Sequence, residues 1–392
     1  MGNLIENRLH RKGPKRILAL DGGGVRGMVT LGILERIEAL LRERSGREGF
    51  RLCDYFDLIA GTSTGSIIAV ALSLGMSVSE INQLYTKLAP AVFKKSKPRK
   101  ALQKIPGWKY LDTLARPRYR RSPLIEALEE EFARYADGAK KMTLEDGHIR
   151  TGLLVLIQRL LPKGHVWAVL NNPTHRFFKH NRKHPLSQLI RASTAAPSFF
   201  EPERLQVGSG ADDSWFIDGG VSPFNNPALA ALFVATMNGF GLKWPLGEDK
   251  LMIVSVGTGF RNERVTPSKL HAKIYLPAMN SLMEECNWLT QAVLQWLSES
   301  PTSWRVHGGT EALDGDLLGG TRWLTYLRYS VELGRRAVRL RKGEEIAKYL
   351  KETELRSLIQ MDNPRNLSRL LHIGKIVGER EVIDTHFSPV FD

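Results

Sequence analysis

The feature of this chain that most constrains its fold is a charge-free stretch over residues 58–79, which a short glycine-rich turn interrupts. The run F-D-L-I-A at 56–60 predicts a buried strand, G-T-S-T-G follows at 61–65, and an uncharged segment to residue 74 predicts a buried helix. This order is the nucleophile-elbow pattern, in which a sharp turn lifts a serine hydroxyl above the sheet. The pattern predicts that Ser63 is a nucleophile, although such a turn could also merely join two buried elements. The glycines and hydroxyls within the stretch argue against a membrane-spanning helix.

Apolar runs of strand length alternate with helical patterns over the first two thirds of the chain. The strands are expected at 16–20, 56–60, 153–157, 166–170, 215–217 and 251–256. This alternation predicts an α/β fold with a mostly parallel central sheet flanked by helices. Beyond about residue 260 the strand signals fade, and helices are expected over 282–297 and 344–360. We therefore expect a catalytic domain over 14–260 and a mainly helical C-terminal region over 261–392 packed on it.

The formal net charge of +15 is concentrated in one segment. Between Lys94 and Arg121, eleven Lys and Arg residues are opposed by one acidic residue, Asp112. Prolines and aromatic residues interrupt the segment, which predicts an irregular basic insertion over 94–121. Such a surface attracts anionic partners such as phospholipid head groups or phosphorylated ligands, unless it is merely a solvated loop. Only two cysteines occur and residues 1–16 contain no apolar core, so we expect neither a disulfide framework nor a signal peptide.

Three glycine-rich turns each follow an apolar strand, at Gly22, Ser63 and Asp218. If the three strands are parallel, their carboxyl ends share one edge of the sheet and the turns can converge. Ser63 would then be the nucleophile, Asp218 the base that accepts its proton, and Gly22, Gly23 and Gly24 the donors of backbone N–H groups to an oxyanion. Because the ordinary pKa of an aspartate is about 4, burial must raise that of Asp218.

These residues also allow other interpretations. Asp218 before two glycines suits a plain turn, and the triglycine loop could hold a phosphate, although it lacks the Lys-Ser/Thr ending of a P-loop. Arg26 could bind an anion or form a surface ion pair. A Ser–Asp–His triad would need His307, His372 or His386, and the residues alone do not choose between a dyad and a triad.

Four motifs together resemble those of patatin-like phospholipases. They are D-G-G-G-V-R-G at 21–27, G-T-S-T-G at 61–65, R-A-S-T-A-A-P at 191–197 and D-G-G at 218–220, in family order over about residues 14–260. The resemblance implies a three-layer patatin-like fold and a Ser63–Asp218 dyad without a histidine. It implies an oxyanion hole formed by Gly22, Gly23, Gly24 and Arg26. It also implies hydrolysis of acyl esters of membrane phospholipids through an acyl-enzyme, without a metal or organic cofactor.

A narrower resemblance rests on the length, the expected lack of a signal peptide and the helical C-terminal region. In these the chain is similar to bacterial patatin-like effectors of antiphage defence. That likeness implies a cytoplasmic protein that a cyclic dinucleotide activates to degrade phospholipids at the inner membrane surface. Oligomers are compatible with it, and no nucleic-acid polymer is expected as a partner. Two other classes stay open: a catalytically silent lipid-binding or ligand-sensing module on the same fold, and a phosphoryl-transfer or nucleotide-binding protein that uses the triglycine loop.

Overall fold

The computed structural model describes residues 4–94, 118–119, 122–136, 141–161, 164–197, 199–208, 214–260, 272–304, 316–334, 337–346 and 350–392. The basic insertion predicted over 94–121 lies almost entirely outside the described residues, so its role stays a prediction. No helix in the described part of the chain is long and apolar enough to cross a membrane.

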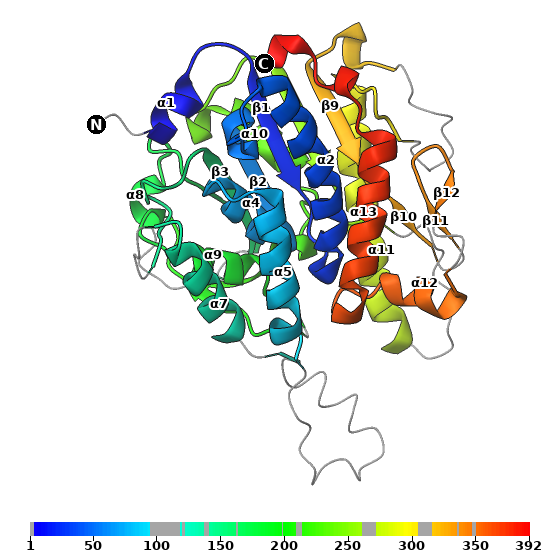
Figure 1. Ribbon diagram of the computed structural model, residues 1–392. Coiled ribbons are helices and arrows are strands. Elements are labelled where there is room, and N and C mark those ends of the chain that lie inside the picture. The colour runs from blue at the N-terminus through cyan, green and yellow to red at the C-terminus, as the bar shows by residue number, and fades with distance from the viewer. Residues whose placement is uncertain are drawn as a thin grey trace, which may run out of the picture.

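A nine-stranded sheet forms the centre of the molecule (Figure 1). Its strands are β1 (Lys15–Leu20), β2 (Leu58–Thr62), β3 (Gly152–Leu161), β4 (His165–Leu170), β5 (Glu203–Leu205), β6 (Ser214–Asp218), β7 (Leu251–Val256), β8 (Ser298–Glu299) and β9 (Leu324–Tyr329). The order is β5-β6-β3-β2-β1-β7-β9-β8, and β4 pairs with β3. The run from β3 to β8 in this order is parallel, whereas β4, β5 and β6 pair in antiparallel fashion. The predicted α/β fold with a mostly parallel sheet is therefore confirmed.

Helices flank this sheet, and β1, β2 and β7 are buried along their whole length, as parallel strands covered on both faces should be. The helices are α1 (Leu4–His10), α2 (Gly27–Ser45), α3 (Leu52–Tyr55), α4 (Thr64–Ser73), α5 (Val78–Val92), α7 (Ser122–Ala133), α8 (Phe178–Asn181), α9 (Leu186–Ser193), α10 (Ala228–Thr236), α11 (Ala272–Trp296), α12 (Glu352–Leu358) and α13 (Leu367–Glu381). Figure 1 shows α2 and α13 side by side in front of the sheet. Their backbones touch, because a Cβ atom on Gly32 would lie 2.5 Å from the Lys375 nitrogen.

The C-terminal region contains more strands than the sequence predicts. β9 joins the central sheet beside β7, and a separate three-stranded sheet contains β10 (Glu332–Leu333), β11 (Val338–Arg339) and β12 (Glu345–Ile346). The helix predicted over 344–360 is wrong, because this segment holds β12 and only the short helix α12. Pairing of β12 with β11 outweighs the helical preference of its Lys- and Glu-rich sequence. The domain boundary at residue 260 stays a prediction.

Candidate active site

The strand that carries Asp218 runs in the opposite direction to the one expected. β3 pairs with β2 as far as Leu156, opposite Thr62, and then continues beyond the end of β2. β6 returns antiparallel along this extension and ends with Asp218 opposite Ile157. Ser63 directly follows Thr62, so Asp218 reaches the same edge of the sheet as Ser63. The turns converge because β3 is long, and not because all three strands are parallel.

Ser63 stands at a strained turn between β2 and α4. Its φ of 52° and ψ of −125° lie in a region that residues other than glycine rarely adopt, as a nucleophile elbow requires. The Ser63 N–H donates to Ser193 Oγ at 2.8 Å, and the Ser193 hydroxyl donates to the Leu156 carbonyl at 2.7 Å. A Cβ atom on Gly65 would lie 2.1 Å from the Leu20 carbonyl oxygen, so only glycine lets α4 begin this close to β1. The turn is therefore held from β3, α9 and β1.

The Asp218 carboxylate lies directly beside the serine hydroxyl. Ser63 Oγ donates to Asp218 Oδ2 at 2.6 Å, and the Gly220 N–H donates to Asp218 Oδ1 at 2.7 Å. Asp218 is only 6% exposed. Burial raises the pKa of Asp218 to about 6, although the two hydrogen bonds and the charge of Arg191 act in the opposite direction. The carboxyl group is therefore ionised at neutral pH and basic enough to accept the serine proton.

The glycine loop after β1 lies next to the serine. A Cβ atom on Gly22 would lie 3.1 Å from Ser63 Cβ. The Gly22 N–H donates to the Asn225 carbonyl at 3.1 Å, and the Arg26 N–H donates to the Gly23 carbonyl at 3.2 Å. Within the described part of the chain, the N–H groups of Gly23 and Gly24 donate to no protein acceptor. Gly24 has a φ of +60°, which favours glycine. Two N–H groups of the loop are thus available to a ligand.

Neither His372 nor His386, the two triad candidates within the described residues, forms a hydrogen bond with Ser63 or Asp218. His372 is exposed on α13, and His386 Nδ1 lies 2.8 Å from the Tyr329 hydroxyl. His307 lies outside the described residues. Among the residues that the structure describes, no group of three or more His, Cys, Asp or Glu side chains could hold a metal ion.

Comparison with known proteins adds the family to this geometry. The family model described as patatin-like phospholipase matches residues 18–232, which is more than half of the chain. The chain belongs to the patatin-like phospholipase family. It is therefore a hydrolase, and the resemblance carried by the four sequence motifs is confirmed.

The relatives of this patatin-like phospholipase include bacterial enzymes with named activators. It is 31% identical over 271 residues to a cGAMP-activated phospholipase of Vibrio cholerae, a match that covers 67% of this chain and 70% of that one. A cGAMP-activated phospholipase of Escherichia coli is 28% identical over 264 residues, covering 66% of each chain. A cUMP-AMP-activated phospholipase of Escherichia coli is 31% identical over 252 residues, covering 63% of this chain and 66% of that one. The matches span about two thirds of each relative.

Sequence reasoning missed two residues that support the site of this phospholipase. Ser193 lies within the 191–197 motif, but only its position beside Ser63 reveals that it anchors the elbow. Arg328 on β9 donates to both oxygens of Asp21, at 2.9 and 2.6 Å, and both side chains are almost fully buried. Burial alone would lower the pKa of Arg328, but the neighbouring Asp21 outweighs burial and raises it. The bidentate geometry is that of an ion pair. Because Asp21 directly precedes Gly22, β9 fixes the start of the glycine loop.

Replacing Arg328 with methionine should lower the free energy of unfolding by about 3–5 kcal/mol, because it leaves the Asp21 charge buried without its partner. Urea denaturation followed by circular dichroism measures the change. The matched control is Arg322→Met, which removes exposed ion pairs with Glu248 and Glu299 and should cost less than about 1 kcal/mol. Equal losses in the two variants would contradict a special role for the buried pair.

Proposed function

We propose that this enzyme hydrolyses acyl esters of membrane phospholipids through an acyl-enzyme on Ser63, with Asp218 as the general base. The observation that carries the proposal is the 2.6 Å hydrogen bond between Ser63 Oγ and Asp218 Oδ2, within a site where burial raises the pKa of the base. A serine hydroxyl is a weak nucleophile unless a base takes its proton, and Asp218 is in position to do so.

The reaction divides into two steps on the same pair of residues. Ser63 Oγ attacks the ester carbonyl as Asp218 accepts its proton, and the N–H groups of Gly23 and Gly24 stabilise the negative charge on the carbonyl oxygen. The tetrahedral intermediate collapses, and the leaving alcohol takes the proton from Asp218. A water molecule then attacks the acyl-enzyme as Asp218 accepts its proton. The second tetrahedral intermediate collapses to release the fatty acid, and Ser63 Oγ takes the proton back from Asp218, which restores the starting state. We assign Gly22 and Arg26 to holding the loop, because their N–H groups bond to carbonyls of the protein.

The outward face of α11 supports action at a membrane surface. Leu282, Leu289 and Trp296 are spaced by seven residues and are 65%, 63% and 42% exposed, whereas Gln291 and Gln295 on the same helix are buried. Exposed apolar patches mark surfaces that meet lipid or another protein. The net charge of +15 favours anionic lipid. We propose that the enzyme acts in the cytoplasm, at the inner membrane surface.

The matched bacterial relatives support a regulated enzyme. Their names state activation by cGAMP or cUMP-AMP. We propose that a cyclic dinucleotide likewise raises the activity of this chain, and that the resulting loss of membrane lipid serves antiphage defence.

The test uses the full chain, vesicles of a fluorogenic phospholipid, and cGAMP or cUMP-AMP as additive, with and without a metal chelator. We expect fatty acid release that the chelator leaves unchanged. A fluorophosphonate probe should label Ser63, as peptide mass spectrometry would reveal, and complete labelling should stop the reaction. Hydrolysis that continues in fully labelled protein would contradict the mechanism. A protein that neither releases fatty acid nor takes up the probe would be the catalytically silent alternative.

The pH dependence of hydrolysis should report the raised pKa of Asp218. The base must be ionised to accept the serine proton, so kcat/KM should fall as the pH decreases through about 6. A soluble ester substrate followed between about pH 4.5 and 8 gives the profile without changes in the membrane itself. A profile that stays flat down to about pH 4.5 would indicate a carboxylate with an ordinary pKa and contradict this account.

A further inference from the structure

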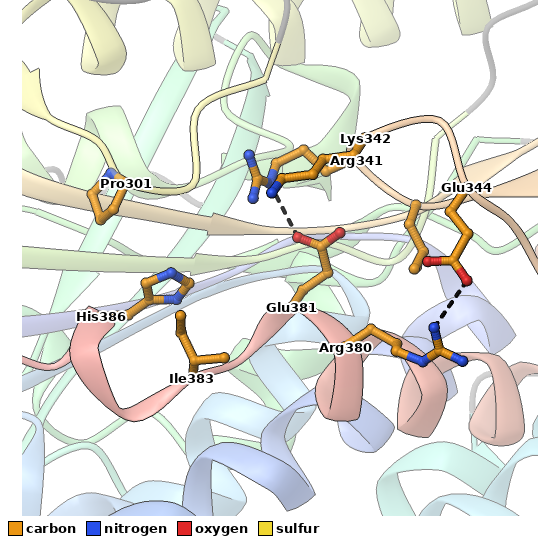
Figure 2. Close-up of a pocket in the computed structure, with 9 residues that line it drawn as sticks. Pro301, Arg341, Lys342, Glu344, Arg380, Glu381, Ile383 and His386 are labelled. Carbon is orange, nitrogen blue, oxygen red and sulfur yellow. Dashed lines mark hydrogen bonds and ion pairs between the residues drawn. The ribbon is translucent and has the colours of Figure 1, made fainter.

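An open pocket of about 480 Å³ lies in the C-terminal region, away from the residues predicted for catalysis (Figure 2). Pro301 after β8, the segment 340–344 between β11 and β12, and the segment 380–386 at the end of α13 form its walls. Its volume falls within the range of small-molecule sites. No step of the proposed hydrolysis uses this pocket.

The pocket presents positive charge that an anion can reach. Three cations line it, Arg341, Lys342 and Arg380, together with two carboxylates, Glu344 and Glu381. Arg341 pairs with Glu381 at 3.1 Å in a largely buried contact. Arg380 pairs with Glu344 at 3.0 Å, but both side chains are at least half exposed, so this pair contributes little and Arg380 can turn toward a ligand. Lys342 has no carboxylate partner among the described residues.

The opposite end of the pocket suits a planar base. Figure 2 shows His386 and Ile383 at one end, Glu344 and Arg380 at the other, and Arg341 and Lys342 between them. Ile383 is 47% exposed and offers apolar contact area to the ring of a base, and the imidazole of His386 can stack on that ring. Burial lowers the pKa of His386 to about 4, so the ring is neutral and does not repel a nucleobase edge.

We infer that this pocket binds a phosphate-bearing nucleotide of dinucleotide size and that its occupation regulates the Ser63–Asp218 site. The guanidinium and ammonium groups meet the phosphates, and the ring and apolar side chain at the His386 end meet a base. The regulatory part rests on the proposed function, whereas the binding part does not.

A direct set of contacts joins the pocket to the glycine loop. The Tyr329 hydroxyl contacts His386 at 2.8 Å, and the Arg328 N–H donates to Thr302 Oγ1, next to Pro301, at 2.6 Å. Both contacts reach the carboxyl end of β9. The Arg328 guanidinium holds Asp21, the residue before the glycine loop. A ligand that moves the pocket walls therefore acts on the strand end that positions the oxyanion donors.

Binding is tested by calorimetric titration of full-length protein with cGAMP and with cUMP-AMP. Lys342→Glu and Arg380→Glu should each weaken the binding of at least one of these nucleotides by about tenfold or more. Lys342→Ala should weaken it less, because this change removes a positive charge without adding a negative one. The control Lys179→Glu makes the same charge change at an exposed position on α8 and should leave the affinity within about twofold. Using the Ser63→Ala background keeps this measurement independent of hydrolysis.

Each result decides one part of the inference. The proposed nucleotide site is wrong if wild-type protein binds neither nucleotide. It is also wrong if Lys342→Glu and Arg380→Glu leave the affinities unchanged. Displacement of the bound nucleotide by equal concentrations of ATP or inorganic phosphate would reduce it to a general anion site and overturn the dinucleotide assignment. The variants could weaken nucleotide binding while wild-type protein hydrolyses no lipid. That result would support the nucleotide site and contradict the proposed function.

The coupling has its own variant. Tyr329→Phe removes the contact with His386 while keeping the aromatic ring. We expect the nucleotide to bind within about threefold of its wild-type affinity while its stimulation of lipid hydrolysis is largely lost. Undiminished stimulation in Tyr329→Phe would overturn the route through β9.

Discussion

Replacing Ser63 with alanine should lower kcat/KM for phospholipid hydrolysis by about 10⁴-fold or more. The change removes the oxygen that forms the acyl-enzyme, and the Asp218 carboxylate then has no hydroxyl to deprotonate. The residual rate comes from direct attack of water on the bound ester, which only substrate binding and the Gly23 and Gly24 N–H groups then assist. Release of fatty acid from fluorogenic vesicles at saturating nucleotide measures the loss.

The matched control for this variant is Ser45→Ala. The Ser45 hydroxyl is exposed near the end of α2 and bonds only to neighbouring main-chain groups. Its removal should leave kcat/KM within about twofold. Circular dichroism spectra of both variants establish that they fold. Residual activity of Ser63→Ala above about one per cent would show that another nucleophile carries the reaction.

Replacing Asp218 with asparagine should lower kcat by about 10³–10⁴-fold and at the same time stabilise the fold. The amide keeps the shape of the carboxylate but cannot accept the serine proton. Because burial raises the pKa of Asp218, ionisation of this carboxyl group destabilises the folded state. The stability that the protonated group contributes is fully present below about pH 4 and is lost as the pH rises through about 6. At pH 7 the asparagine variant should therefore gain about 1–3 kcal/mol in unfolding free energy.

Two measurements check this pair of effects, a kcat determination and urea denaturation at pH 7. Asp249→Asn is the control, because Asp249 is exposed and forms no ion pair with any residue that the structure describes. It should change neither quantity appreciably. An Asp218→Asn variant that is less stable than wild type would mean that the carboxylate is a net structural contact rather than a buried charge held for catalysis.

The sequence predicts that Ser63 and Asp218 lie together, and the structure brings their side chains within hydrogen-bond distance, because each stands in a short local motif. The strand, turn and helix around Ser63 fix one position, and the turn after Asp218 fixes the other. The direction of β6 could not be predicted, because the apolar pattern of a strand is the same in both directions. The length of β3 was equally hidden, since Gln158 and Arg159 continue the strand beyond its apolar run.

The C-terminal region was harder to predict because its elements depend on distant partners. β9 carries Arg328, and a charged residue lowers the apparent strand character of a run until its buried partner Asp21 is known. β12 is only two residues long and exists through its pairing with β11. The role of Ser193 depends on a turn more than a hundred positions earlier in the chain. In each case the deciding interaction is long-range, which periodicity does not register.

The continuity of the sheet across β1 has a consequence for dissecting this polypeptide. The family match ends at residue 232, before β7, yet β7 pairs along the whole of β1 and β9 pairs with β7. Cutting the chain there would leave β1 with a bare edge and a row of unsatisfied amides, which invites aggregation. The family segment is therefore not a self-sufficient unit in this molecule, and swapping tails between homologues must preserve the last two parallel strands.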